Sequence, residues 1–107
     1  MSGQERTNPY ASMTTLISGE RGGSTSAVQL PNVPGRMVKL KARFNNPGRV
    51  YIGGANTLTK ADGNTDTTSG MELSAREETG WLPLDNLNRI WVVMDSVSDA
   101  IQYLVIR

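Results

Sequence analysis

The chain of 107 residues contains no cysteine and no histidine. Disulfide bonds, thiol nucleophiles and imidazole bases are therefore excluded, together with the usual zinc and copper ligand sets. Aromatic residues are few, and no apolar run approaches the roughly 20 residues of a membrane span. These absences remove most hydrolase and redox chemistries. We expect a protein without enzymatic activity, without a cofactor and without a membrane partner.

The charge distribution is uneven although the net charge is only +1. Residues 1–60 hold 8 Lys/Arg and 2 Asp/Glu, a net of +6, whereas residues 61–107 hold 3 and 8, a net of −5. Either the two halves pair within one fold, or the surface is polarised toward charged partners. The first residues lack a charged-then-apolar signal pattern, so we expect synthesis in the cytoplasm rather than export by that route.

Short β-rich runs separated by turn residues predict a single all-β domain. The clearest strand is 38–44, where Val38, Leu40, Ala42 and Phe44 alternate with cations. Further strands are expected at 27–30, 49–52, 71–73 and 81–84, and in two runs within 89–107. Seven or eight short strands without a long helix predict a small antiparallel β-sandwich. A jelly roll suits this count best.

The stretch Arg89–Arg107 is the most apolar part of the chain. Two runs rich in β-branched and aromatic residues flank a short polar turn, which predicts a β-hairpin. In the first run Val92 and Met94 lie on one face, and Trp91 and Val93 lie on the other. Because both faces are apolar, we expect both to be covered. We expect part of the second face, including Trp91 and Tyr103, to be covered by another chain.

Residues 1–26 are dominated by polar residues and glycine, and we place them outside a sandwich that spans residues 27–107. Tyr10, Met13, Leu16 and Ile17 are the only anchors in this segment. It is either a loose terminus or an arm that orders against a neighbouring subunit.

Two groups of side chains have competing interpretations. The cationic face of Lys39, Lys41 and Arg43 is either a solvated face that protects a sheet edge or a contact for an acidic protein. Tyr51 and Trp81 are either a platform for sugar rings or part of the core or a subunit interface. The basic stripe is too small to predict nucleic-acid binding.

Two local motifs are incomplete. Asp62, Asn64 and Asp66 match the start of a calcium loop, but the glycine and the bidentate glutamate of that loop are missing, so we favour a turn. The sequence from Ser74 to Glu77 fits a capping box and predicts one helical turn.

The order of short motifs along the chain resembles that of a known family. Six segments follow one another in the chain: Ala27-Val-Gln-Leu-Pro31, the alternating strand ending at Asn46, Arg49-Val-Tyr-Ile-Gly-Gly54, Gly70-Met-Glu-Leu73, Trp81–Leu84 and Asp85–Val92. This order resembles small β-sandwich structural proteins of tailed-bacteriophage virions, especially capsid decoration (cement) and head-fibre proteins. The likeness covers residues 27–107 and depends on turns and patterning.

The resemblance implies a homotrimer that binds the major capsid protein on the exterior of the virion and is made in the host cytoplasm. Expected capsid contacts are Tyr10, Leu16, Ile17, Arg21, Lys39, Lys41 and Arg43. Expected core or subunit-interface residues are Trp81, Trp91, Val93, Tyr103 and Val105. A tail, neck or fibre-attachment protein and a carbohydrate-binding module remain as alternatives.

Overall fold

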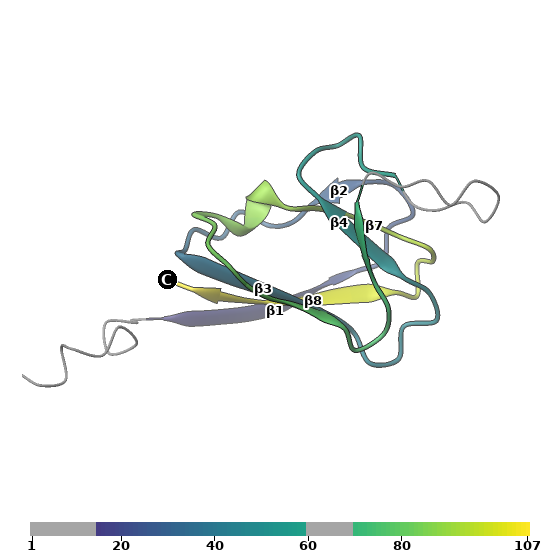
Figure 1. Ribbon diagram of the computed structural model, residues 1–107, viewed down its shortest axis with the longest axis horizontal. Coiled ribbons are helices and arrows are strands. Elements are labelled where there is room, and N and C mark those ends of the chain that lie inside the picture. The colour runs from purple at the N-terminus through teal and green to yellow at the C-terminus, as the bar shows by residue number, and fades with distance from the viewer. Residues whose placement is uncertain (1–14, 60–69) are drawn as a thin grey trace, which may run out of the picture.

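The computed structural model describes residues 15–59 and 70–107, and this part of the chain is almost entirely β-structure. Two four-stranded antiparallel sheets lie face to face as layers (Figure 1). The strand order is β1-β8-β3-β6 in sheet A and β2-β7-β4-β5 in sheet B. The predicted small antiparallel β-sandwich is therefore confirmed.

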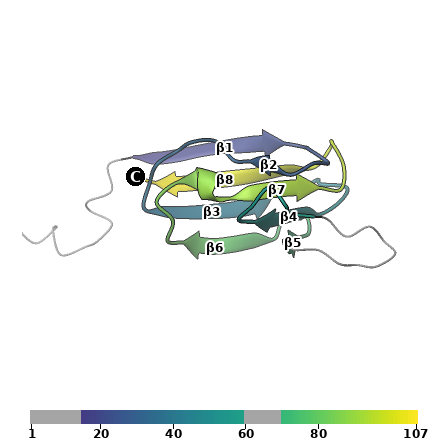
Figure 2. The ribbon, with the colours of Figure 1, turned by 90° about the horizontal axis from the view of Figure 1, so that it is seen from above.

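The element bounds are β1 Leu16–Gly22, β2 Val28–Gln29, β3 Met37–Ala42, β4 Val50–Gly53, β5 Met71–Leu73, β6 Glu78–Leu82, β7 Trp91–Met94 and β8 Ala100–Ile106, with a 3₁₀ turn, η3, at Leu87–Arg89. The strands pair in a nested pattern: β1 with β8, β2 with β7, β3 with β6 and β4 with β5. Pairing of β3 with β8 and of β4 with β7 joins these pairs into sheets. Figure 2 shows β1 and β6 at the two edges of sheet A.

The main core fills the space between the sheets. In β3, Val38, Leu40 and Ala42 are fully buried, whereas Lys39 and Lys41 lie on the opposite face, because successive side chains of a strand alternate. The other buried members of this core are Leu30, Val50, Ile52, Leu73, Leu87, Ile90, Val92, Met94, Ile101 and Val105. Each such side chain contributes about 1.5–3 kcal/mol by its burial.

The predicted C-terminal hairpin is wrong. β7 lies inside sheet B and β8 inside sheet A, so residues 95–99 carry the chain from one layer to the other. The buried carboxylate of Asp99 holds this connection by accepting hydrogen bonds from the backbone N–H groups of Gly48 (2.8 Å) and Ser96 (3.0 Å). A polar turn between two apolar strands is common to hairpins and to sandwich connections. Periodicity alone therefore does not distinguish them.

The chain itself covers the outer face of sheet B. Tyr51, Leu58 and Val93 form a second buried cluster, against which Ala27 and Trp91 pack. Leu58 belongs to the loop after β4, which arches over this sheet in Figure 1. Val93 is only 3% exposed in the single chain. A second chain is therefore not needed to cover this part of the C-terminal stretch.

The sandwich begins earlier than the predicted boundary at residue 27. β1 pairs with β8 over seven positions, from Leu16 opposite Ile106 to Gly22 opposite Ala100. Ile17 packs against the main core, whereas Leu16 is exposed. The alternation is difficult to recognise in the sequence because glycine and charged residues occupy most of the strand.

Two further local expectations were wrong. Ser74 to Glu77 form a tight turn with Arg76 at φ +73°, not a helical turn. The Glu77 carboxylate still accepts a hydrogen bond from the Ser74 N–H (2.6 Å), which is one half of the capping box. β3 ends at Ala42, so Phe44 does not continue the buried face and is exposed instead.

Candidate interaction surface

The outer face of sheet A carries ordered rows of side chains from all four strands. The first row holds Leu16, Ile106 and Met37; the second holds Ser18, Leu104, Lys39 and Trp81; the third holds Glu20, Gln102, Lys41 and Glu78. The first two rows are mainly apolar, and the third is polar and charged. Leu16 is 51% exposed and Trp81 is 39% exposed. Leu16 and Trp81 lie on the two edge strands of the sheet, and the less exposed side chains of Ile106, Met37 and Leu104 lie between them. Large apolar side chains that share one exposed face are typical of contact surfaces.

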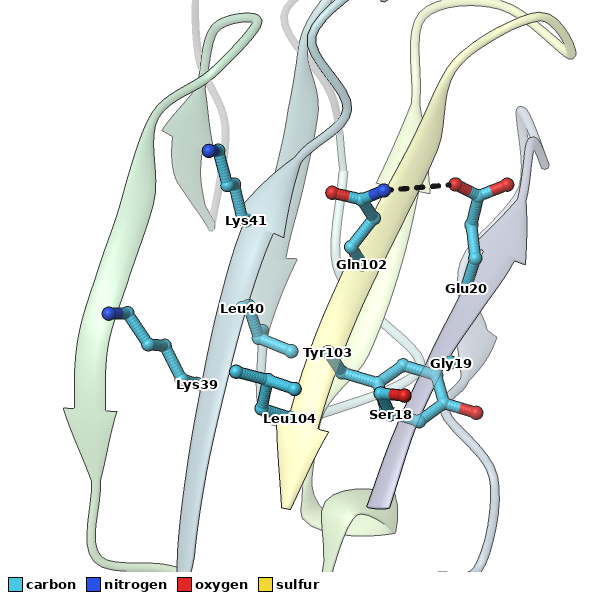
Figure 3. Close-up of a pocket in the computed structure, with 9 residues that line it drawn as sticks. All are labelled: Ser18, Gly19, Glu20, Lys39, Leu40, Lys41, Gln102, Tyr103 and Leu104. Carbon is cyan, nitrogen blue, oxygen red and sulfur yellow. Dashed lines mark hydrogen bonds between the residues drawn. The ribbon is translucent and has the colours of Figure 1, made fainter. Parts of the chain in front are cut away.

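A shallow groove of about 470 Å³ crosses the middle of this face (Figure 3). The side chains of Ser18, Glu20, Lys39, Lys41, Gln102 and Leu104 line it, together with Gly19, Leu40 and Tyr103. Small-molecule pockets usually enclose most of their ligand. Because this groove is open, it suits contact with an extended protein segment better than enclosure of a small substrate.

Lys39 is at the centre of a three-residue contact on this face. Its Nζ lies 2.8 Å from Oε1 of Glu78 and 5.6 Å from the centre of the Trp81 ring. The hydrogen bond and charge of Lys39 hold the pKa of Glu78 below its usual range. These contacts fix the Trp81 ring on the surface, since a cation over the ring face is attracted by its electrons.

A second ion pair lies beyond the charged row. Arg43 Nη1 lies 3.4 Å from Oε2 of Glu20, and Arg43 Nη2 donates to the carbonyl of Ser98 (2.8 Å). Gln102 Nε2 also donates to Glu20, at 3.5 Å. Three cations (Lys39, Lys41, Arg43) and two carboxylates (Glu20, Glu78) therefore give this face a net charge of +1 by addition. The predicted cationic stripe is real, but its own chain neutralises much of it.

The expected capsid contacts do not form one surface. Leu16, Lys39 and Lys41 lie on the outer face of sheet A, and Arg43 lies beside it. Ile17 packs into the core, and Arg21 lies on the same side of β1 as Ile17 and is half-buried. Tyr10 lies outside the described residues.

The expected core or interface residues also separate. Val105 is in the main core, and Tyr103 packs against that core. Val93 is buried in the outer cluster of sheet B, with Trp91 half-buried beside it. Trp81 alone lies on the outer face of sheet A.

Of the two interpretations of Tyr51 and Trp81, the joint sugar platform is not present, whereas a place in the core holds for Tyr51. Tyr51 is 1% exposed beneath the loop of sheet B, whereas Trp81 belongs to sheet A. Burial, followed by the charge of Asp95, raises the pKa of the Tyr51 hydroxyl. The two rings therefore face different sides of the molecule and do not bind one ligand together.

A polar depression at one end of sheet B was not predicted from the sequence. It has a volume of about 380 Å³ and is lined by Gln29, Gly54, Asp85, Asn86, Asn88, Arg89 and Trp91. Asn86 caps η3 by accepting from the Asn88 N–H (2.9 Å), and Arg89 donates to both carboxylate oxygens of Asp85 (2.9 and 3.1 Å). Arg89 thereby lowers the pKa of Asp85. Asn and Asp are common turn residues, so the sequence of residues 85–88 predicted only a turn and not their grouping with Gln29, Gly54 and Trp91.

Residues 15–59 and 70–107 contain no group of three or more acidic residues arranged to hold a metal ion. The possible calcium ligands Asp62, Asn64 and Asp66 lie outside these ranges. No helix in the described part of the chain is long and apolar enough to cross a membrane.

Protein-family models, curated proteins and solved structures gave no match to this chain.

Proposed function

We propose that this protein is a non-enzymatic structural component of a phage virion, which binds the outer surface of the capsid and stabilises contacts between major capsid subunits. The observation that carries the proposal is the outer face of sheet A. It combines an exposed tryptophan and leucine with ion-paired charges on a rigid sheet. Aromatic and apolar side chains surrounded by polar groups are typical of protein–protein interfaces.

The topology supports a structural role. We assign the sandwich to the jelly-roll class, because the nested pairing of its strands is that of one long antiparallel ribbon folded over on itself. Jelly rolls occur in viral capsid proteins and lectins, so the topology agrees with the family resemblance without deciding the function.

The charge of the face favours a protein partner over nucleic acid. Proteins that bind nucleic acid by its backbone present a strongly basic patch. Here Glu20 and Glu78 lie among the cations, and the net charge is close to neutral. A capsid surface with both charges and apolar patches matches such a face better than a uniformly anionic polymer does.

Binding to undecorated phage heads tests the proposal directly. We expect the purified protein to co-sediment with the heads and to raise the temperature at which they open. Trp81→Asp should weaken binding roughly thirtyfold, the effect of losing an interface residue that contributes about 2 kcal/mol. The matched control is Met71→Asp, since Met71 is 55% exposed but belongs to sheet B. Absence of co-sedimentation, or an equal loss in both variants, would contradict the proposal.

The contribution of Tyr10 is tested separately by deleting residues 1–14. This deletion retains β1, whereas deleting residues 1–26 would remove a strand of the sandwich.

Imaging of labelled protein on virions distinguishes the capsid from the tail, neck or fibre attachment. The resemblance implies a homotrimer, and the number of copies is measured in the experiments below.

A saccharide-binding module is the second candidate, favoured by the polar depression at the end of sheet B. Amide and charged side chains surround Trp91 there, a combination that suits a ligand rich in hydroxyl groups. A glycan array tests this function. Binding that is lost in Trp91→Ala and retained in Trp81→Ala, without affinity for phage heads, would favour this candidate over the first.

A further inference from the structure

The free edge of β1 differs from the other three edges of the sandwich. In sheet B the edge strands are short, since β2 has two residues and β5 has three. In sheet A the β6 edge is irregular: Gly80 has φ +76°, the pairing with β3 shifts between Lys39 and Lys41, and Pro83 follows the strand. Short strands, bulges and prolines protect sheet edges from pairing with other chains. β1 has seven residues in regular register and has none of these features.

The direction of the backbone groups of β1 follows from its hydrogen bonds. The Arg107 N–H donates to the carbonyl of Thr15 (3.0 Å), and these residues are opposite one another in the register that continues from Leu16 and Ile106. In an antiparallel pair, every second residue bonds to the partner strand. Odd-numbered residues of β1 therefore bond to β8. The N–H and C=O groups of Leu16, Ser18, Glu20 and Gly22 point to the other side, where the described chain provides no strand.

We propose that β1 pairs with β1 of a second copy, antiparallel and about a twofold axis at Gly19. This register makes four hydrogen-bonded pairs from the free groups, each with two bonds. Leu16 then lies opposite Gly22 of the partner subunit, and Ser18 lies opposite Glu20 of the partner subunit. In this register no two like charges lie directly opposite one another, an arrangement that would be destabilising.

Charge selects this register among its neighbours. An axis at Glu20 would place two carboxylates opposite each other, and an axis at Arg21 would do the same with two guanidinium groups. An axis at Ser18 would place Leu16 opposite Glu20 of the partner subunit. Among these four registers, only the axis at Gly19 gives each Glu20 a hydroxyl donor, from Ser18 of the partner subunit. In this register the side chains of one copy of β1 are thus complementary to those of the other copy.

Tyr103 provides independent support for a contact at this edge. A Cβ on Gly19 would collide with the Tyr103 hydroxyl and ring, so the ring occupies space that only glycine leaves free. In Figure 3 the ring crosses β1, and its hydroxyl lies beyond the strand on the side away from β8. In the paired arrangement the two Tyr103 hydroxyls lie near the axis, where a polar group can find a partner.

The pairing goes beyond the proposed function, because it concerns a contact between two copies in solution and needs no capsid. Sedimentation at increasing concentration tests it. We expect the mass to rise from 11.6 kDa toward twice that value. A mass that stays at 11.6 kDa into the millimolar range overturns the proposal, and so does a limiting mass of three chains, which a twofold contact does not produce.

Substitutions of the exposed Ser18 test the register. Ser18→Glu places two carboxylates opposite each other at two symmetric positions, so the dissociation constant should rise about tenfold. Ser18→Lys should lower it, since each lysine faces Glu20 of the partner subunit. Ser18→Pro should abolish pairing while the fold is retained, because its lost N–H faces away from β8. Circular dichroism of dilute samples confirms the fold. Equal dissociation constants for Ser18→Glu and Ser18→Lys would refute the register.

Amide hydrogen exchange tests the pairing residue by residue in the wild-type protein, so it does not depend on whether the variants fold. In dilute wild-type protein the amides of Ile17, Gly19 and Arg21 should be protected by β8, whereas those of Ser18 and Glu20 should exchange rapidly. At high concentration Ser18 and Glu20 should become protected as well. Protection that does not depend on concentration would overturn the proposal.

Discussion

Replacing Asp99 by alanine tests how the chain passes from sheet B to sheet A. Asp99 is 1% exposed, and its carboxylate accepts the N–H groups of Gly48 and Ser96. Alanine leaves both donors without this acceptor. A buried unsatisfied group costs about 1–3 kcal/mol. Because both N–H groups are only part-buried, the lower half of this range applies to each, and Asp99→Ala should lower the free energy of unfolding by about 2–4 kcal/mol. This is a large part of the roughly 5–15 kcal/mol that stabilises a typical domain.

Urea denaturation followed by tryptophan fluorescence measures this loss. The matched control is Asp95→Ala in the same connection, because the exposed Asp95 carboxylate accepts one backbone N–H, from Arg49 (3.0 Å), and also contacts the Tyr51 hydroxyl. Water can replace the exposed acceptor, so the control should lose less than Asp99→Ala, about 1 kcal/mol. Asp99→Asn should fall between the two, since its amide keeps one acceptor oxygen. Similar losses for Asp99→Ala and Asp95→Ala would refute the assignment of Asp99 as the residue that holds the connection.

Three further predictions concern the outer face of sheet B, the contact between Gly19 and Tyr103, and the outer face of sheet A. Leu58→Ala should lower the free energy of unfolding by about 2–3 kcal/mol and increase binding of an apolar dye, because it uncovers sheet B. Gly19→Ala should cost about 1–3 kcal/mol by collision with Tyr103, and a double-mutant cycle with Tyr103→Ala should show strong coupling in urea melts. Lys39→Met should raise the pKa of Glu78 toward its ordinary value, as measured by NMR titration. Because the pKa of Glu78 is depressed in the folded state, the ion pair stabilises the wild-type protein at pH values above the ordinary pKa of Glu78, and this stabilisation is lost as the pH falls through the folded pKa. Lys39→Met should lack this pH-dependent stabilisation.

Most strands could be predicted from the sequence because each has a local pattern. The run 38–44 has an alternating apolar face, and Met71–Leu73 appears with the predicted bounds. β1 could not be recognised, since its inward positions are Ile17, Gly19 and Arg21, which provide one large apolar side chain between them. Its strand conformation depends on pairing with β8, 78 to 90 residues further along the chain, and not on local propensity.

The partner of each strand was harder to predict than its existence. The apolar runs of 89–107 suggested a hairpin, but each strand has neighbours in a different sheet. The decisive residue is Asp99, which reads as an ordinary turn residue until its contacts with Gly48 are known. Contacts over such sequence separations are not encoded in local periodicity.

The candidate surface was predicted in part. Alternation correctly placed Lys39 and Lys41 on one face, but their neighbours Trp81 and Glu78 come from another strand whose register depends on a bulge at Gly80. For Tyr51 the sequence left a sugar platform and a place in the core as alternatives, and the structure places it in a buried cluster. Its alternation places it on the outer side of sheet B, and only the three-dimensional course of the loop that carries Leu58 shows that it is covered.

The two proposals reinforce each other through geometry. A twofold axis perpendicular to sheet A keeps the outer faces of both copies on the same side, so pairing at β1 would join two binding faces into one continuous surface. Two linked faces bind a repetitive lattice more tightly than one face does, because the second contact is intramolecular. Gly22→Pro removes a pairing N–H at the end of β1 and lies outside the groove, so it should weaken capsid binding although the groove and Trp81 are untouched. Trp81→Asp should weaken capsid binding without changing the dimer mass. If Gly22→Pro abolishes the dimer and leaves capsid affinity unchanged, the pairing does not contribute to capsid binding, even if each proposal holds separately.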